Sequence, residues 1–249
     1  MNIFDSWIAT TPIAHRGLYN EKYPENSLAA FKNAVKNKLP LELDVSCLAD
    51  GTPVVFHDQK LARMTGKDGF ISLLKYEEVS KLTLAGTKER IPTLKEALSV
   101  IDGKVPVLIE IKNYGKVGLI EKEVWKVLQG YGGEYIIASF NPYTLEWFKK
   151  NAPNVKRGQF SSFFKDREIT GIKRFALKRM MLNKKVSEPN VILYNGNDLP
   201  NRYVKKYVGK LPIIAFEIHS EEDEKKVRSH ANNIIFDNYI PEIISDKIK

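Results

Sequence analysis

The stretch LELDV at residues 41–45 decides the fold class, because it is an apolar strand that carries two acidic side chains. Glu42 and Asp44 are two positions apart, and the side chains of a strand alternate between its two faces. Both carboxylates therefore point the same way. Buried carboxylates are costly unless they are paired or bind a cation, so the pattern predicts a strand with a functional acidic pair.

The stretch VLIEIK at residues 107–112 repeats this design, with Glu110 and Lys112 on one face of a second predicted strand. Two more polar motifs, HRG at residues 15–17 and HD at residues 57–58, also follow short apolar runs. Every group thus lies at, or directly after, the end of a predicted strand. In a parallel barrel such ends converge on one mouth, which predicts a common site.

Short apolar strands alternate with amphipathic helical stretches over the 249 residues. The predicted strands are residues 12–14, 41–45, 107–111, 135–139, 156–160, 190–194, 212–216 and 233–236. The predicted helices are residues 26–37, 93–101, 118–130, 142–151, 201–208 and 221–229. Eight such strands over a chain of about 250 residues predict an α/β protein with a (β/α)8 TIM-barrel fold. A doubly wound open sheet is the alternative, and the shared mouth favours the barrel.

We expect one domain, residues 1–249, with a small insertion after the second strand. Residues 59–90 are too long for a simple connection between strands. They follow an apolar run that ends at His57. We expect this inserted segment to fold over or beside the rim of the barrel mouth.

The composition, 43% hydrophobic with a net charge of +9, is that of a globular protein with a sizeable core. No apolar run approaches the roughly 18 residues of a membrane-spanning helix, and the N-terminus lacks the features of a removed signal. Nucleic-acid binding is not expected, because no basic module with interleaved aromatic residues is recognised. Cys47, the single cysteine, predicts a structural thiol and fits a reducing, cytoplasmic location.

A basic stretch, KRFALKRMMLNKK at residues 173–185, follows the fifth strand. One interpretation is an ordinary barrel helix with a solvated basic face. The other is an amphipathic surface that makes a weak contact with an anionic membrane. Sedimentation with anionic vesicles at low salt separates these interpretations.

The chemistry of the polar set points to phosphate. Glu42, Asp44 and Glu110 supply three carboxylates, which suit one hard divalent cation, Mg²⁺ or Ca²⁺, better than zinc. Arg16 and Lys112 add positive charge beside that cation, so the group can clamp an anion such as phosphate.

His15 and His57 flank this clamp on separate strand ends. One imidazole could take a proton from an attacking oxygen while the other gives a proton to the leaving oxygen. The combined prediction is metal-assisted cleavage of a phosphodiester. The other histidines receive no role, since His230 lies in a charged helical stretch and His219 only follows a strand towards the rim.

The chain resembles the glycerophosphodiester phosphodiesterases from residue 13 to about residue 239. The shared motifs are AHRG at 14–17, PENS at 24–27, LELDV at 41–45, DGTPVVFHD at 50–58, RMTG at 63–66, IPTL at 91–94, EIK at 110–112 and SFNP at 139–142. The resemblance implies a TIM barrel with a small insertion after the second strand. It also implies acid/base catalysis by the two histidines, metal binding by the three carboxylates, and phosphate binding by Arg16 and Lys112.

The reaction implied by the resemblance is hydrolysis of glycerophosphodiesters, which are deacylated phospholipids, to sn-glycerol 3-phosphate and an alcohol. Either water or a glycerol hydroxyl attacks phosphorus, and both remain open here. Within the PENS motif, Ser27 and Asn26 are candidate caps of the first helix, and Glu25 is a candidate contact to the metal shell or the substrate. Phe216 stands where a tryptophan is frequent in the family. We therefore expect Phe216 to offer the substrate an apolar contact at the rim of the barrel, with a ring of different shape.

Two other functions compete with this one. A lysophospholipase D or a related phospholipase would act on lipid substrates, with residues 173–185 and the pair Phe163-Phe164 as support. A barrel that only binds phosphate is disfavoured, because every position expected to carry chemistry is present. The preferred alcohol and the oligomeric state stay open at this point.

Overall fold

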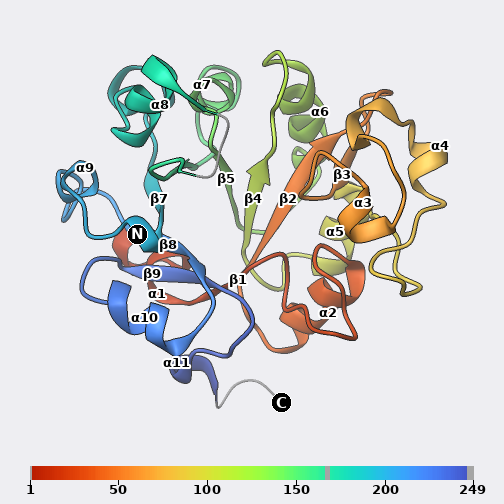
Figure 1. The fold of residues 1–249 in the computed structure, drawn as a ribbon, viewed down its shortest axis with the longest axis horizontal. Coiled ribbons are helices and arrows are strands. Elements are labelled where there is room, and N and C mark those ends of the chain that lie inside the picture. Colours follow the sequence, from red (N-terminus) through yellow and green to blue (C-terminus); the bar gives the residue numbers. More distant parts are fainter. Residues whose placement is uncertain (1, 166–168, 246–249) are drawn as a thin grey trace. The chain divides into compact units, whose positions relative to one another are not determined.

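The computed structural model describes residues 2–165 and 169–245. The chain forms two compact units. The N-terminal unit is Ala14–Tyr135, and the C-terminal unit is Ile136–Lys249 together with Met1–Ile13. Figure 1 labels the elements of both.

The N-terminal unit is built around the predicted acidic strand. Its elements are β1 (Ile13–Ala14, at the boundary), α2 (Leu28–Lys36), β2 (Leu41–Cys47), β3 (Pro53–Val55), α3 (Ala62–Thr65), η2 (Ile71–Leu73), α4 (Tyr76–Val79), α5 (Leu94–Ile101), β4 (Val107–Ile111) and α6 (Leu119–Leu128). The central strand, β2, pairs in parallel with β1 and β4 and antiparallel with β3. The register sets Asp44 beside Glu110, so carboxylates from neighbouring strands lie at the same level.

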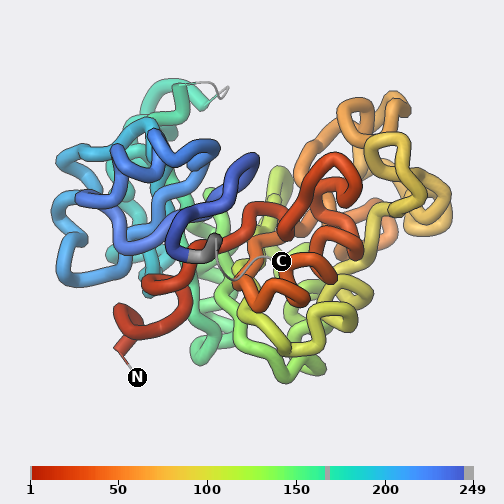
Figure 2. The backbone as a smooth tube through the Cα atoms, turned by 90° about the horizontal axis from the view of Figure 1, so that it is seen from below, coloured from red at the N-terminus to blue at the C-terminus, as the bar shows by residue number. Residues whose placement is uncertain are grey.

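The inserted segment, residues 59–90, forms α3, η2 and α4 and packs on its own small core. The buried members of that core are Leu48, Val54, Phe56, Leu61, Met64, Ile71, Val79, Leu84 and Ile91. Figure 2 shows this part of the tube, orange to yellow, folded back on itself. The segment is therefore anchored to β3 by apolar packing.

The C-terminal unit contains five consecutive parallel strands. Its elements are η1 (Ile3–Asp5), α1 (Trp7–Thr10), β5 (Tyr135–Ser139), α7 (Pro142–Asn151), β6 (Arg157–Ser161), α8 (Gly171–Lys178), η3 (Asn183–Ser187), β7 (Val191–Asn195), η4 (Gly196–Asp198), α9 (Arg202–Lys205), β8 (Ile213–Ile218), α10 (Glu221–Val227), β9 (Asn233–Phe236) and α11 (Glu242–Ser245). Strands β5 to β9 pair in the order of the chain. The amide of Asn233 donates to the carbonyls of Ile8 and Thr11, at 3.0 and 2.6 Å, and so ties the N-terminal residues to β9.

Several helices begin where the sequence supplies a cap. Ser27 Oγ accepts from Ala30 N at the start of α2, and Thr93 with Glu96 closes a capping box on α5. Helix α9 is shorter than predicted, since Arg202–Lys205 replaces the expected residues 201–208.

Within the described residues, the eight parallel strands β1, β2 and β4 to β9 alternate with helices in chain order. The protein thus has the (β/α)8 TIM-barrel fold of the α/β class, as predicted, with β3 as an additional antiparallel strand. Among the described helices, none is both long and apolar enough to cross a membrane. The expectation of a single domain stays a prediction.

Candidate active site

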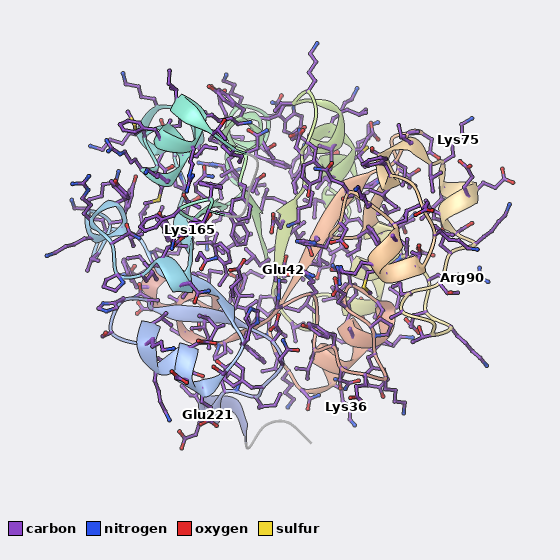
Figure 3. The ribbon with its side chains drawn as sticks, viewed as in Figure 1. Lys36, Glu42, Lys75, Arg90, Lys165 and Glu221 are labelled. Atoms are coloured by element: carbon purple, nitrogen blue, oxygen red, sulfur yellow. The ribbon has the colours of Figure 1, made fainter. Side chains whose placement is uncertain are left out.

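Eight of the nine predicted site residues lie in the N-terminal unit, on β2, β4 and the loops that follow the strands. Each of Glu42, Asp44 and Glu110 is buried, and one oxygen from each lies within 4.8 Å of the others. Figure 3 labels Glu42 on β2. The structure thus brings the three predicted metal ligands together.

The electrostatics of this cluster fit a cation. Burial, followed by the charges of Asp44 and Glu110, raises the pKa of Glu42 well above its ordinary value. Glu42 Oε2 accepts from the backbone N–H of Arg16 at 2.9 Å. Among the described residues, Glu42 Oε1 is buried with no hydrogen-bond partner. An all-oxygen donor set with excess negative charge and a free oxygen is what a hard divalent cation requires.

Two cations flank the carboxylates. Lys112 Nζ lies 3.0 Å from Asp44 Oδ1 and 2.8 Å from Glu110 Oε1. Burial opposes the charge on Lys112, but Asp44 and Glu110 more than offset it and raise the pKa of the ammonium. Arg16 Nε lies 3.2 Å from Asp44 Oδ2. Despite burial, Asp44 and Glu25 raise the pKa of Arg16, so both predicted phosphate ligands carry full charge.

The backbone of the HRG loop explains its glycine. Arg16 and Gly17 both adopt positive φ, 54° and 81°, a region that disfavours most side chains. A Cβ on Gly17 would lie 2.9 Å from Phe31 Cδ1 and 3.0 Å from the carbonyl carbon of Ala30. Glycine is therefore required at position 17, and the turn directs Arg16 towards the carboxylates.

Asn26 has a role that sequence reasoning missed. Its Nδ2 donates to Asp44 Oδ2 at 2.9 Å, and Asp44 N donates to Asn26 Oδ1 at 3.3 Å. The residue has a φ of 56°, which asparagine tolerates better than most residues. Of the two candidate caps of the first helix, Ser27 is confirmed and Asn26 was wrong, because Ser27 Oγ accepts from Ala30 N. Its place in the PENS motif was the available signal.

His57 is held by its neighbour in the chain. Its Nδ1 lies 2.6 Å from Asp58 Oδ1. Assigning the proton to Nδ1 leaves Nε2 free to exchange a proton with a substrate. The pKa of Asp44 is held well below its ordinary value against burial, first by Lys112 and then by His57, Arg16 and His15. Both predicted acid/base residues therefore lie within electrostatic reach of the cluster.

A second missed residue, Arg63, comes from α3 of the inserted segment. Its Nε and Nη2 donate to Asp58 at 2.6 and 3.1 Å, and its Nη1 and Nη2 donate to Glu25 at 2.8 and 2.7 Å. Glu25 Oε1 also accepts from Arg16 Nη1 at 2.7 Å. Glu25 thus pairs with two arginines and is not a member of the three-carboxylate group.

Phe216 belongs to the C-terminal unit, on β8, and is buried. Its ring packs edge-on against Phe160 and Phe140, with centroids 5.1 and 5.8 Å apart. In the same unit, His219 Nδ1 contacts the buried carboxylate of Asp237. A role for Phe216 in substrate binding stays a prediction.

Comparisons with known proteins agree with this geometry. The sequence model of the "Glycerophosphoryl diester phosphodiesterase family" matches residues 15–207. A glycerophosphodiester phosphodiesterase of Caldanaerobacter subterraneus is 43% identical over 162 residues, or 60% of this chain and 65% of that relative. The chain thus spans just under two thirds of that relative. A putative glycerophosphodiester phosphodiesterase of Bacillus subtilis is 33% identical over 68% of this chain and 79% of its own length.

The fold is shared with a solved phosphodiesterase of Oleispira antarctica, determined in complex with the product sn-glycerol-3-phosphate. The two chains are 25% identical, each is covered over 96% of its length, and the TM-score is 0.79. The shared motifs from His15 to Pro142 lie within the region that the family model matches. This chain belongs to the glycerophosphoryl diester phosphodiesterase family.

Proposed function

We propose that the protein hydrolyses glycerophosphodiesters to sn-glycerol 3-phosphate and an alcohol, with the help of one divalent cation. The observation that carries this proposal is the group of three buried carboxylates, within 4.8 Å of one another, flanked by Arg16 and Lys112. Family membership and the named activity of the relatives support it.

Glu42, Asp44 and Glu110 would hold the cation, which we propose to be Mg²⁺ or Ca²⁺ because every donor is a carboxylate oxygen. When bound, the cation would neutralise negative charge on the phosphate. Arg16 and Lys112 would bind the remaining phosphate oxygens as permanent cations. Glu25 would act on the substrate through Arg16, because it accepts a hydrogen bond from the Arg16 guanidinium and so orients it. Phe216 would offer an apolar contact to the substrate.

His15 and His57 would transfer the protons. One imidazole removes a proton from the attacking hydroxyl, which is that of water or of the substrate's glycerol, as its oxygen bonds to phosphorus. The other donates a proton to the leaving oxygen as its bond to phosphorus breaks. Asp58 keeps His57 in one tautomer through the 2.6 Å contact with Nδ1. The half-buried Cys47 takes no part, since burial and Glu123 raise the pKa of its thiol to about 11, and a lone thiol fits a reducing cytosol.

The test is release of sn-glycerol 3-phosphate from glycerophosphocholine and glycerophosphoethanolamine, with Mg²⁺, Ca²⁺ or EDTA. We expect metal-dependent release, a loss of about 10²–10⁴-fold in His57→Ala, and full activity in His230→Ala. His230 is the matched control because it lies in the other unit, beside Ser229. Equal activity of wild type and His57→Ala, or activity that EDTA leaves unchanged, would contradict the proposal.

A second candidate function, a lysophospholipase D-type action on lipids, is favoured by helix α8. None of its residues is buried, and Ile172 and Phe175 are 88% and 43% exposed. The Arg179 guanidinium stacks 3.6 Å from the centre of the Phe175 ring. With the six cations of residues 173–185, this surface suits a weak contact with an anionic membrane.

Activity on micellar lysolipid above that on soluble diesters would favour this second function. Sedimentation with anionic vesicles at low salt tests the surface itself, with Ile172→Glu as the variant. Leu73→Glu is the control, because Leu73 is similarly exposed, at 72%, in the other unit. Equal sedimentation of both variants and wild type would exclude residue 172 from the contact.

A further inference from the structure

Arg16 and Lys112, the two proposed phosphate ligands, are together called the phosphate clamp. The N-terminal unit contains a cavity of about 570 Å³ whose wall includes Lys112 of this clamp. Three parts of the unit line it: the end of β2, the inserted segment, and the loop between β4 and α6 with the first turn of α6. The lining residues that bear on the inference are Gln59, Ser72, Lys112, Asn113, Tyr114 and Lys116. The volume lies in the range of small-molecule sites.

Two features connect this cavity to the reacting centre. Lys112, which pairs with Asp44 and Glu110, lies in its wall. Gln59, also in the wall, is two residues from His57 along the chain. Two larger cavities, one in each unit, are lined by none of the predicted site residues.

A phosphodiester carries two alcohol groups, so a phosphate held by Arg16 and Lys112 must extend into neighbouring space. We propose that this cavity binds the alcohol that is released, and that it selects uncharged polyols over quaternary ammonium alcohols such as choline. This inference rests on the proposed function, because it assumes a diester at the clamp.

The lining explains the selection. Its charged members are Lys112 and Lys116, and the lining contains no acidic residue. Three acidic residues outside the lining act on Cys47 in its wall, and each is already engaged. Glu123 accepts from Lys126 Nζ at 2.7 Å, and Asp50 accepts from Thr52 N and Tyr76 N at 3.0 and 2.8 Å. Asn113 Nδ2 and Gly118 N donate to Glu121 at 2.6 and 2.7 Å.

The exposed Lys116 repels a cationic alcohol. Tyr114 is the one aromatic residue in this lining, whereas sites for quaternary ammonium groups use cages of several aromatic rings. The side chains of Gln59, Ser72 and Asn113 can hydrogen-bond hydroxyl groups.

The test compares kcat/KM for three diesters of sn-glycerol 3-phosphate whose released alcohols are inositol, choline and methanol. The methyl diester barely enters the cavity and serves as the reference. We expect Lys116→Glu to shift the inositol-to-choline ratio about tenfold towards choline. We expect Ser72→Trp, which fills the cavity, to lower kcat/KM about tenfold for the inositol diester and to leave the methyl diester unchanged.

Lys95→Glu and Ser99→Trp are matched controls, because both residues are exposed and line the other cavity of the same unit. They should reproduce the wild-type ratios. Hydrolysis of the methyl diester with unchanged ratios in Lys116→Glu and Ser72→Trp overturns this inference and leaves the proposed function standing. If Ser72→Trp lowers kcat/KM equally for all three diesters, the cavity binds the glycerol group that they share. That result also overturns this inference. No release from any diester by the wild type overturns the proposed function and this inference together.

Discussion

Arg63 donates a hydrogen bond to each carboxylate oxygen of Asp58, from Nε to Oδ2 at 2.6 Å and from Nη2 to Oδ1 at 3.1 Å. The same guanidinium donates twice to Glu25. Because Asp58 orients His57 and Glu25 holds Arg16, one side chain of the inserted segment connects the acid/base residue with the phosphate clamp. The pKa of Arg63 is raised above its ordinary value, and the hydrogen bond to Glu25 is the largest cause. The Arg63 guanidinium is therefore permanently charged.

Arg63→Lys should lower kcat about tenfold and change KM less. A lysine keeps the charge but cannot bridge two carboxylates with a planar fork, so His57 and Arg16 lose their fixed orientation. Steady-state kinetics with a glycerophosphodiester measure this split.

Arg90→Lys is the control for that variant, since Arg90 ends the same segment and is exposed, as Figure 3 shows. It should behave as wild type. If Arg63→Lys also matches the wild-type kcat, the bridge does not position the catalytic groups.

Glu42→Gln should abolish stabilisation of the protein by Mg²⁺ or Ca²⁺ without lowering the stability of the metal-free protein. The raised pKa of Glu42 means that its carboxyl is already disfavoured as an anion, and the amide oxygen can still accept from Arg16 N. For the wild type, a cation at 100 times its Kd adds about 2.7 kcal/mol. Thermal unfolding in EDTA and in added metal measures both effects, and Glu123→Gln is the control. If the metal stabilises Glu42→Gln as much as it stabilises the wild type, Glu42 is not a ligand.

Asn26→Ala should destabilise the protein by about 1–3 kcal/mol. The change removes the 2.9 Å bond to the buried carboxylate of Asp44 and leaves alanine in a left-handed conformation. Urea unfolding gives the free energy, with Asn20→Ala as a control in an exposed loop. A loss below about 0.5 kcal/mol would show that the bond contributes little.

Acidification should destabilise the protein as the pH falls through about 4.5. Despite burial, the His57 and Arg63 hydrogen bonds hold the pKa of Asp58 below its ordinary 3.8, and Arg63 and Arg16 hold that of Glu25 below 4.5. In this window the unfolded chain binds more protons than the native protein, so the unfolding free energy rises with pH and falls on acidification.

Asp58→Asn should flatten that pH dependence, while Asp68→Asn, at an exposed position of the inserted segment, should leave it unchanged. Urea unfolding from pH 7 to pH 2.5 provides the comparison. A curve for Asp58→Asn as steep as that of wild type would remove this carboxylate from the acid response.

Much of the fold followed from local pattern. The apolar runs at residues 107–111, 135–139 and 233–236 coincide with β4, β5 and β9, because a strand buried on both faces must be apolar nearly throughout. The alternation with helices then left few topologies to consider. The acidic cluster was equally predictable, since period-two spacing within β2 and β4 sets its carboxylates on common faces.

The partners of those residues were not predictable in the same way. Asn26 bonds Asp44 across 18 positions of the chain, and Arg63 bonds Glu25 across 38. Neither contact leaves a periodic signal, because each depends on how two loops meet after the strands have paired.

The sequence by itself determined the element order, the barrel class and the identity of the charged groups, since these depend on side-chain alternation and apolar patterning along the chain. Only the tertiary structure decided which charges are paired, which carboxyl oxygen of Glu42 is left free, and that Arg63 joins His57 to Arg16 through Asp58 and Glu25. The physical reason is that pairing and burial depend on distances between segments remote in the chain, which packing sets after local structure has formed.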